Sequence, residues 1–493
     1  MIYNFNLGIG WASSGVEYAQ IYRARMFRNI GVDAKFVFTD MFPQENIEHM
    51  TKNIGFEDSE VIWLYTFFTD FKTAPVTYTL SDLEKTFSNT EYTKSREGKI
   101  CRYVFNGSNN FYTAYMVNDH DDYVHRVEMV SGGCLIRKDY FTYGRVYSEY
   151  YAPLDNAAHL YHRRFFYEDG SVAYEEMIDD DKVMYKFKDK MLCSKEEFVG
   201  YMVSQLNLTS DDIVIIDRTT DIGQAIMMNC KPAKVGIIVH ADHFSEKDTN
   251  DDYILWNNYY EYDFNMHKHV DFYVCATQAQ SDLMKAQFEK YYGVTPNMYT
   301  IPVGSLPELK YPSSTRKPYS LITASRLASE KHVDWICKAV IQARSEVPEL
   351  SLDIYGVGGE REKLENIIRD NNASGYIHLM GQHDLSEVYQ NYEAYIAGST
   401  SEGFGLTLME AVGGGLPIIG FDVRYGNPTF IRDGENGYLI SLPEEDKDRV
   451  EALRKGIVDL FKQDLEKCHE VSYSVAQDFL TSNVQEKWRE AVC

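Results

Sequence analysis

The segment Ser399–Ala411, STSEGFGLTLMEA, joins a predicted strand to a predicted helix through a glycine-rich turn. Such a turn exposes free backbone N–H groups at the positive end of a helix dipole, which favours a phosphate or an oxygen-rich ligand. Glu402 lies in the turn, and Glu410 lies about two helical turns further along. Their carboxylates can accept hydrogen bonds from hydroxyl groups. The segment therefore predicts a site for a nucleotide sugar, although a tight turn with two solvated glutamates is the simpler alternative.

Strand and helix patterns alternate over two long parts of the chain, which predicts an α/β protein with parallel sheets. The segment 306–318 contains three prolines and is expected to be a linker. The expected parts are an N-terminal Rossmann-like domain on the acceptor side (1–69 and 201–305), a C-terminal Rossmann-like donor-binding domain (319–475) and a C-terminal helix (476–493).

Residues 70–200 have a different pattern. Aromatic segments alternate between apolar and polar positions, and turn signals such as GSNN, DHDD, SGG and EDGS separate them. This pattern predicts an antiparallel β-meander domain inserted into the first α/β domain. Asp119 and Asp121 form a DxD spacing, but they fall in a turn between strands, which disfavours a metal site.

Composition restricts the classes of protein. The chain has 493 residues, enough for two or three domains, and a formal net charge of −25, which argues against a nucleic-acid partner and gives no general attraction to anionic lipid. Its eight cysteines lack CxxC spacing and are expected to be reduced thiols. The first residues, MIYNFNLGIGW, do not form a signal peptide, and no apolar run approaches the ~18 residues that span a bilayer. We therefore expect a cytoplasmic protein.

Two further motifs carry charge or an imidazole at the ends of predicted strands. In SRLASEK, Arg326 follows a buried strand and Lys331 opens the following helix, so the two cations can neutralise the phosphates of a leaving nucleoside diphosphate. Ordinary surface charges are the alternative. His240 ends the strand KVGIIVH, at the edge where open α/β sheets bind ligands, and His243 is its neighbour. A metal pair formed by the two histidines lacks a third ligand at suitable spacing.

Glycine-rich strand ends complete the candidate site. A strand at 2–7 leads into a glycine turn and a helix, which Ser13 or Ser14 can cap. The helix starts near Gly15, where a packing glycine in an ordinary turn is the alternative. The segment YGVGGE (355–360) predicts another turn near the nucleoside, and GQHDLSEVY (381–389) predicts a strand end followed by a helix.

These motifs resemble the E-x7-E, Arg/Lys and strand-end His elements of retaining GT-B glycosyltransferases of the GT4 type. The blocks NLGIGWASSGVEYAQ, VHADHFSE, DDYILWNNYY, SRLASEK and TSEGFGLTLMEA, with the meander insertion, are similar to the GtfA family. The resemblance implies a GT-B fold and transfer of GlcNAc from UDP-GlcNAc to Ser/Thr of serine-rich repeat adhesins. It also implies a hetero-oligomer with a catalytically inactive, GtfB-like paralogous subunit, which would grip the acceptor and aid peripheral membrane association.

The resemblance assigns roles residue by residue. It implies catalytic roles for His240, Arg326, Lys331 and Glu402, with no metal or other cofactor because cationic side chains hold the departing diphosphate. The C-terminal helix is expected to cross back onto the first domain, as in other GT-B folds. The donor-binding residues would also include Gly15, Val16, Glu17, Tyr18, Gln382, His383, Gly403, Phe404, Gly405, Leu406 and Glu410.

Three other functions compete with this hypothesis. A wall teichoic acid (polyribitol-phosphate) GlcNAc transferase shares the insertion, but its anionic acceptor favours a basic groove, which a net charge of −25 disfavours. A glucose-specific adhesin transferase differs in pocket residues that the motifs do not identify. A non-catalytic acceptor-binding subunit would lack the four catalytic residues, and this chain has them all.

Overall fold

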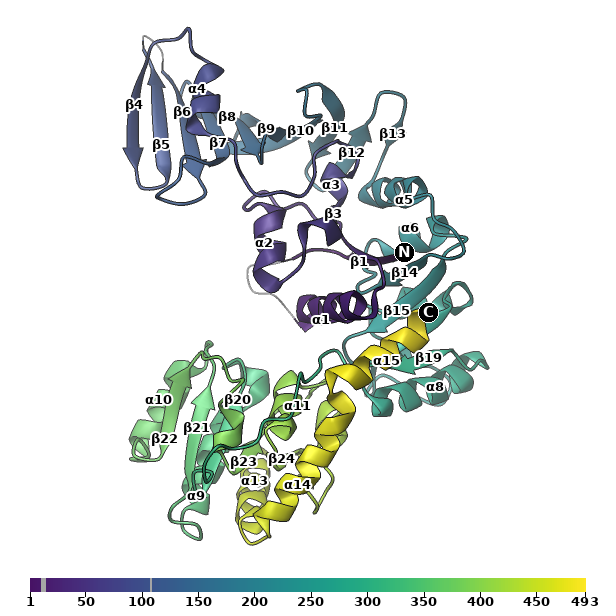
Figure 1. Cartoon of the computed structure of the whole chain (residues 1–493), viewed down its shortest axis with the longest axis vertical. Helices are drawn as coiled ribbons and strands as arrows, with labels where there is room; N and C mark the ends of the chain where they lie inside the picture. Colours follow the sequence, from purple (N-terminus) through teal and green to yellow (C-terminus); the bar gives the residue numbers. More distant parts are fainter. Residues whose placement is uncertain (10–14, 107–108) are drawn as a thin grey trace. The chain divides into compact units, whose positions relative to one another are not determined.

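A computed structural model describes residues 1–9, 15–106 and 109–493 (Figure 1). The chain divides into two compact units. Unit 1 comprises Met1–Ala24, Val32–Ile238 and Asn258–Asp271, and unit 2 comprises Arg25–Gly31, Val239–Asn257 and Phe272–Cys493. The eight cysteines, all within the described ranges, are free thiols. In the part of the chain that the structure describes, no helix is both long and apolar enough to cross a bilayer.

Unit 1 contains a parallel sheet whose strands follow the order β3-β2-β1-β14-β15. This order runs outward from β1 in both directions, as in Rossmann folds. The four residues of β14 are buried, as expected for a strand covered on both faces. The strands are β1 (Ile2–Asn6), β2 (Ala34–Phe38), β3 (Val61–Trp63), β14 (Ile213–Ile216) and β15 (Lys234–Val239), and the longer helices are α1 (Gly15–Ile30), α2 (Ile47–Ile54), α5 (Lys195–Gln205) and α6 (Gly223–Asn229).

The insertion in unit 1 is a ten-stranded antiparallel sheet in which every strand pairs with its neighbours in sequence. Alternate residues of β5 are buried, so Cys101, Tyr103 and Phe105 face one side of the sheet. Helix α4 (Leu80–Lys85) contributes Leu80 and Leu83 to the same buried cluster. The strands are β4 (Tyr92–Glu97), β5 (Ile100–Phe105), β6 (Asn110–Met116), β7 (Val124–Ser131), β8 (Cys134–Phe141), β9 (Arg145–Leu154), β10 (Ala157–Phe166), β11 (Val172–Asp179), β12 (Lys182–Lys186) and β13 (Met191–Leu192).

A row of alternating charges crosses five strands of this sheet. Strand register places its members opposite one another in the order Glu128, Lys138, Glu149, Arg163 and Glu176. Arg163 bonds Glu149 at 2.9 Å and Glu176 at 2.8 Å, and both carboxylates are buried. Because unlike charges directly opposite each other stabilise a sheet, this charge row favours the observed register.

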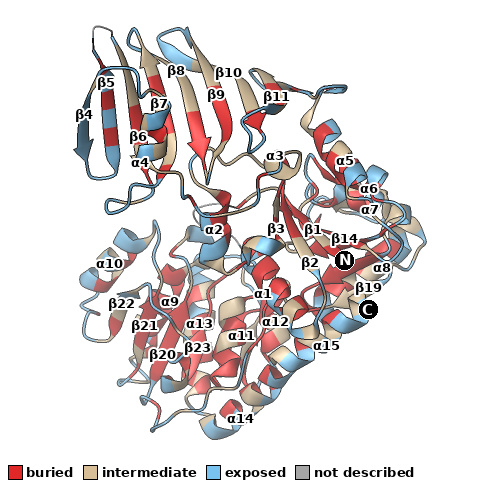
Figure 2. Ribbon diagram, turned by 45° about the horizontal axis from the view of Figure 1, so that its top comes forward, coloured by how far each residue is buried: buried red, intermediate tan, exposed pale blue. Residues whose placement is uncertain are grey.

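Unit 2 contains a six-stranded parallel sheet in the order β22-β21-β20-β23-β24-β25. Figure 2 shows buried residues concentrated in these strands and in the helix faces against them. The order reverses between β20 and β23, and the crevice at such a switch point is where open α/β sheets bind ligands. The strands are β20 (Ser320–Ala324), β21 (Ser351–Tyr355), β22 (Ile377–Gly381), β23 (Ala394–Ile396), β24 (Ile418–Phe421) and β25 (Gly437–Ile440).

Helices surround this sheet, and two further short strands, β18 (Phe272–Cys275) and β19 (Met298–Thr300), pair in parallel within unit 2. The predicted α/β class with two Rossmann-like sheets and an antiparallel insertion is confirmed. The helices of the six-stranded sheet are α9 (Val333–Ala343), α10 (Arg361–Asp370), α11 (Leu406–Gly413), α12 (Gly426–Phe430), α13 (Asp446–Leu460) and α14 (Leu465–Ala476), whereas α8 (Gln278–Tyr292) and α15 (Thr481–Val492) contact β19.

One predicted element is wrong. The helix expected over Leu385–Tyr392 is only a 3-10 turn at Tyr389–Asn391. Asp384 does accept a hydrogen bond from the backbone N–H of Ser386, as a helix cap would, but buried Tyr389 bonds Glu410 of α11 and a long-range contact thus competes with helix formation. The predicted cap of the first helix, Ser13 or Ser14, lies outside the described residues.

Candidate active site

The two strands at the switch point of unit 2 each deliver one charged residue of the predicted site. Lys331 follows β20, Glu402 follows β23, and the Lys331 Nζ donates a hydrogen bond to Glu402 Oε2 at 2.7 Å. The side chains keep 19% and 21% of their surface exposed, so the pair remains accessible to a ligand. An ammonium and a carboxylate thus meet where a diphosphate and a sugar would require opposite charges.

The loop after β20 is held by close backbone contact with the loop after β21. Gly356 and Gly358 adopt φ of 131° and 158°, and a Cβ atom would lie 1.9 Å from Ser325 O and 2.4 Å from Leu327 O, respectively. The Leu327 N–H donates to Val357 O at 2.9 Å. Only glycine permits this approach, so the GVGG segment supports the loop that carries Arg326.

Arg326 itself is the most exposed of the predicted cations. Its side chain is 78% exposed and contacts Glu330 at 3.1 Å, one helical turn away in sequence. A solvent-exposed pair of this kind contributes little stability, so the guanidinium can exchange Glu330 for a phosphate at small cost.

The two glutamates of the E-x7-E segment have different surroundings. Glu410 lies on α11 and accepts a hydrogen bond from the Tyr389 hydroxyl at 3.0 Å. Burial raises the pKa of Glu410 above its usual value. Gly405, at φ 87°, precedes the helix, and a Cβ there would approach the Leu408 side chain to 2.6 Å. The glycine therefore allows α11 to begin directly after the turn that carries Glu402.

His240 lies against the same turn. It follows β15, and a Cβ atom on Gly403 would lie 3.3 Å from the His240 carbonyl oxygen. His243 is fully buried, and its Nε2 lies 2.6 Å from Gln287 Oε1. Burial lowers the pKa of His243 to about 4, so its imidazole is neutral near pH 7. Of the two histidines, His240 has the less enclosed side chain.

The structure places the other predicted donor-binding residues in three groups. Gly15, Val16, Glu17 and Tyr18 form the first turn of α1 in unit 1, where Val16 and Glu17 are buried and Tyr18 is 46% exposed. Gln382 and His383 lie in the loop after β22, and His383 Nε2 is 2.9 Å from the Met380 carbonyl oxygen. Phe404 and Leu406 flank Gly405.

Phe404 is a core residue. It is buried, and its ring lies 5.3 Å from that of Phe430 and 6.0 Å from that of Phe479. Its ring is therefore enclosed by other side chains, which leaves only its backbone for contact with a ligand. Leu406, the first residue of α11, is half-buried.

Sequence reasoning missed three residues around Glu402. Tyr425 follows β24 and is buried, and its hydroxyl donates to Asp242 Oδ1 at 2.6 Å. Arg424 contacts Asp242 at 3.3 Å. Asp242 lies two positions after His240. The only sequence signal was that Arg424 and Tyr425 follow the carboxyl end of a parallel strand, where functional residues gather.

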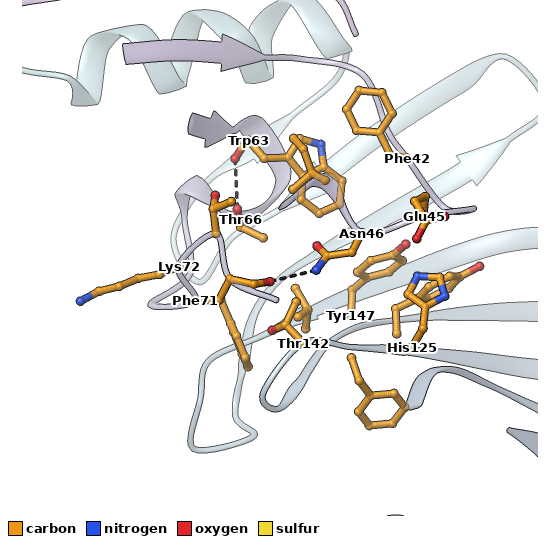
Figure 3. A pocket seen from close by; sticks show the side chains of 16 residues that line it. Phe42, Glu45, Asn46, Trp63, Thr66, Phe71, Lys72, His125, Thr142 and Tyr147 are labelled. Atoms are coloured by element: carbon orange, nitrogen blue, oxygen red, sulfur yellow. Dashed lines mark hydrogen bonds between the residues drawn. The ribbon is translucent and has the colours of Figure 1, made fainter. Parts of the chain in front are cut away.

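A separate cavity lies within unit 1 (Figure 3). It is small, with a volume of about 40 Å³, and lies between the segment 42–74 and strands β7 to β9. Its walls include Phe42, Trp63 and Tyr147, with Asn46 and His125 among the polar groups. None of the predicted site residues lines it.

Metal ligands do not gather in the described ranges 1–9, 15–106 and 109–493. No group there of three or more His, Cys, Asp or Glu residues is arranged to hold an ion. In the DxD turn, Asp121 instead accepts a hydrogen bond from the Asn118 amide at 2.8 Å.

Comparison with known proteins places the chain in a family. The family model for the GtfA extended beta-sheet domain matches residues 93–189, and the model for glycosyl transferases group 1 matches residues 310–477. The UDP-N-acetylglucosamine–peptide N-acetylglucosaminyltransferase GtfA subunit of Streptococcus gordonii is 52% identical over 493 residues, covering 99% of this chain and 97% of that protein.

Solved structures agree with this relationship. A crystal structure of a GtfA/B complex matches with a TM-score of 0.96 and 52% identity, covering 100% of this chain and 99% of that one. The pneumococcal O-GlcNAc transferase GtfA in complex with UDP and GlcNAc matches with a TM-score of 0.89 and 50% identity, covering 100% and 98%. The fold is accordingly GT-B. The chain belongs to the family of GtfA subunits of UDP-N-acetylglucosamine–peptide N-acetylglucosaminyltransferases.

Proposed function

We propose that this chain is a retaining glycosyltransferase that moves GlcNAc from UDP-GlcNAc to Ser/Thr hydroxyls of a serine-rich repeat adhesin, as the first step of its O-glycosylation. Full-length similarity to a GtfA solved with UDP and GlcNAc carries the proposal. The Lys331–Glu402 pair at the switch point of unit 2 supplies the charges that such a donor needs.

The residues around this pair can perform the reaction without a metal. Arg326 and Lys331 neutralise the charge that develops on the departing UDP, and the N-terminus of α11 adds its dipole. Glu402 accepts hydrogen bonds from the sugar hydroxyls once Lys331 turns to the phosphate. His240 contacts the sugar and the phosphate. Because the acceptor attacks on the side that UDP leaves, a UDP oxygen takes the hydroxyl proton, and the anomeric configuration is retained.

The family also suggests the partner and the place of action. The GtfA/B crystal structure supports a hetero-oligomer with a GtfB-like subunit. We infer that this partner grips the adhesin and associates peripherally with the membrane, while the transferase acts in the cytoplasm. Membership of the GtfA family favours a peptide acceptor over polyribitol phosphate.

A direct experiment tests donor and acceptor together. The chain and its GtfB-like partner are incubated with a Ser/Thr-rich peptide and a panel of UDP-sugars, and the peptide mass is measured with and without EDTA. We expect a gain of one or more N-acetylhexosamines from UDP-GlcNAc alone, at the same rate with EDTA, and a gain at least about a hundredfold slower with Glu402→Gln. A gain from UDP-glucose instead, or loss of the reaction with EDTA, would contradict the proposed donor or the metal-free mechanism.

A further inference from the structure

Tyr425 connects two segments of unit 2 that are about 180 residues apart in sequence. Its hydroxyl lies 2.6 Å from Asp242 Oδ1 and 3.1 Å from His243 Nδ1, and its ring stacks on the His243 ring at 5.9 Å. The Tyr425 side chain is 1% exposed. The residue therefore packs tightly against the segment that begins with His240.

The backbone of the same residue holds Glu402. The N–H groups of Tyr425 and Gly426 both donate to the Glu402 carbonyl oxygen, at 2.6 and 2.7 Å, and the Glu402 N–H donates to Arg424 O at 3.1 Å. A Cβ on Gly426 would lie 2.3 Å from Phe404 O and 2.9 Å from Glu402 Cγ. The segment 424–426 thus fixes both the backbone and the first side-chain carbons of Glu402.

The protonation of the neighbouring groups determines which of them accepts the hydrogen bond of the Tyr425 hydroxyl. His243 Nε2 faces the oxygen of Gln287 at 2.6 Å and must donate to it, so a neutral His243 ring presents an unprotonated Nδ1. The hydroxyl has one proton and two acceptors, Asp242 and His243. The hydroxyl donates its hydrogen bond to the charged Asp242 carboxylate, which is also the nearer acceptor, because charge-assisted hydrogen bonds are the stronger ones.

Arg424 forms a second connection beside the first. Its guanidinium lies 3.3 Å from Asp242 and 3.4 Å from Glu246, and it stacks 4.7 Å above the Phe244 ring. Asp242 therefore receives two bonds from the segment that holds Glu402. A shift of this segment would move Glu402 relative to His240.

We propose that Tyr425 is a positioning residue whose hydroxyl, through Asp242, fixes Glu402 relative to the His240 segment for sugar transfer. This inference rests on the proposed function, in which Glu402 orients the sugar hydroxyls. The Tyr425 hydroxyl is buried between Asp242 and His243, so its proposed role is exerted through Glu402. Its influence is expected in kcat, because misplacement of a group that orients the reacting sugar weakens the transition state more than the bound donor.

Tyr425→Phe removes only the hydroxyl and keeps the buried ring. Tyr473→Phe is the matched control in the same unit, because the Tyr473 hydroxyl bonds the backbone oxygens of Lys310 and Gly414 at 2.7 and 3.2 Å. We expect kcat for GlcNAc transfer to fall about tenfold in Tyr425→Phe, with KM for UDP-GlcNAc within about twofold. Tyr473→Phe should keep its kcat, and Asp242→Asn should reproduce the loss in kcat.

A double-mutant comparison separates positioning from general destabilisation. Single-turnover rates are measured for Glu402→Gln with and without Tyr425→Phe. Because Tyr425 acts through Glu402, adding Tyr425→Phe should slow Glu402→Gln by less than about twofold. A full tenfold further loss, an unchanged kcat in Tyr425→Phe, or an equal loss in Tyr473→Phe would overturn the inference. If the wild-type chain with its partner transferred no GlcNAc, the proposed function would fail instead.

Discussion

Replacing Arg163 by Met should destabilise the inserted sheet far more than the same change at Arg164. Arg163 lies between Glu149 and Glu176, and both carboxylates are 2% exposed or less. Burial lowers the pKa of the Arg163 guanidinium, but attraction to Glu176 and Glu149 outweighs burial and raises the pKa above its usual value. The arginine is therefore the cation that compensates two buried negative charges.

The magnitude follows from what remains after the substitution. Breaking a buried ion pair by removing one partner costs about 3–5 kcal/mol because the other charge stays buried. Tyr140 and Tyr151 still donate to Glu149, at 2.8 and 2.6 Å, which limits the penalty at that carboxylate. We therefore expect Arg163→Met to lower the free energy of unfolding by about 3 kcal/mol. Adding Glu149→Gln and Glu176→Gln to Arg163→Met removes the two uncompensated buried charges. This triple variant should recover much of the lost free energy of unfolding.

Arg164 is the neighbouring control on the opposite face of β10. Its side chain is 43% exposed and pairs with Glu175 at 2.8 Å, so Arg164→Met should cost less than about 1 kcal/mol. Urea unfolding followed by circular dichroism at the β-sheet band measures both variants. Equal losses for Arg163→Met and Arg164→Met would refute the idea that burial of the charge row determines its energetic importance.

Three further predictions concern the site and the core. Gly358→Ala should destabilise unit 2 by about 3 kcal/mol because its Cβ would overlap Leu327 O, whereas Gly359→Ala, whose Cβ would have no neighbour within 4 Å, should be tolerated; thermal melts compare them. Arg326→Ala should lower kcat at least about hundredfold while leaving the melting temperature unchanged, since its pair with Glu330 is exposed; normal turnover would exclude Arg326 from the site. Burial lowers the pKa of His125 to about 4, so below pH 6.5 the unfolded chain binds more protons than the folded one. The free energy of unfolding should therefore fall by up to about 3 kcal/mol between pH 6.5 and 4. His125→Phe should make the midpoint of urea unfolding depend less on pH in this range.

Local patterns predicted most of the fold because the strands of each sheet are recognisable from short sequence segments. Buried four- or five-residue apolar runs marked strands such as β14 and β20, and turn signals marked the antiparallel insertion. The failure at Leu385–Tyr392 has a tertiary cause. Tyr389 is buried and bonds Glu410, twenty-one positions later, so a long-range contact competes there with helix formation.

The candidate site was less predictable for the same reason. Glu402, Lys331 and Arg326 belong to recognisable motifs, but the sequence could not indicate that Lys331 and Glu402 bond each other across 71 positions. Tyr425 was missed altogether. Its partners Asp242 and His243 come from a distant segment, and no spacing rule connects residues that only the fold brings together.

The sequential pairing of β4 to β13 has a consequence for the order in which the chain acquires structure. β1 cannot pair with β14 until the ribosome has added more than two hundred residues, whereas each insertion strand meets its partner a few residues later. Local pairs form fast and distant ones slowly. During synthesis the meander should therefore fold first and bring its two flanking segments together. The insertion that interrupts the Rossmann-like sheet of unit 1 in sequence would then shorten the search by which β1 finds β14.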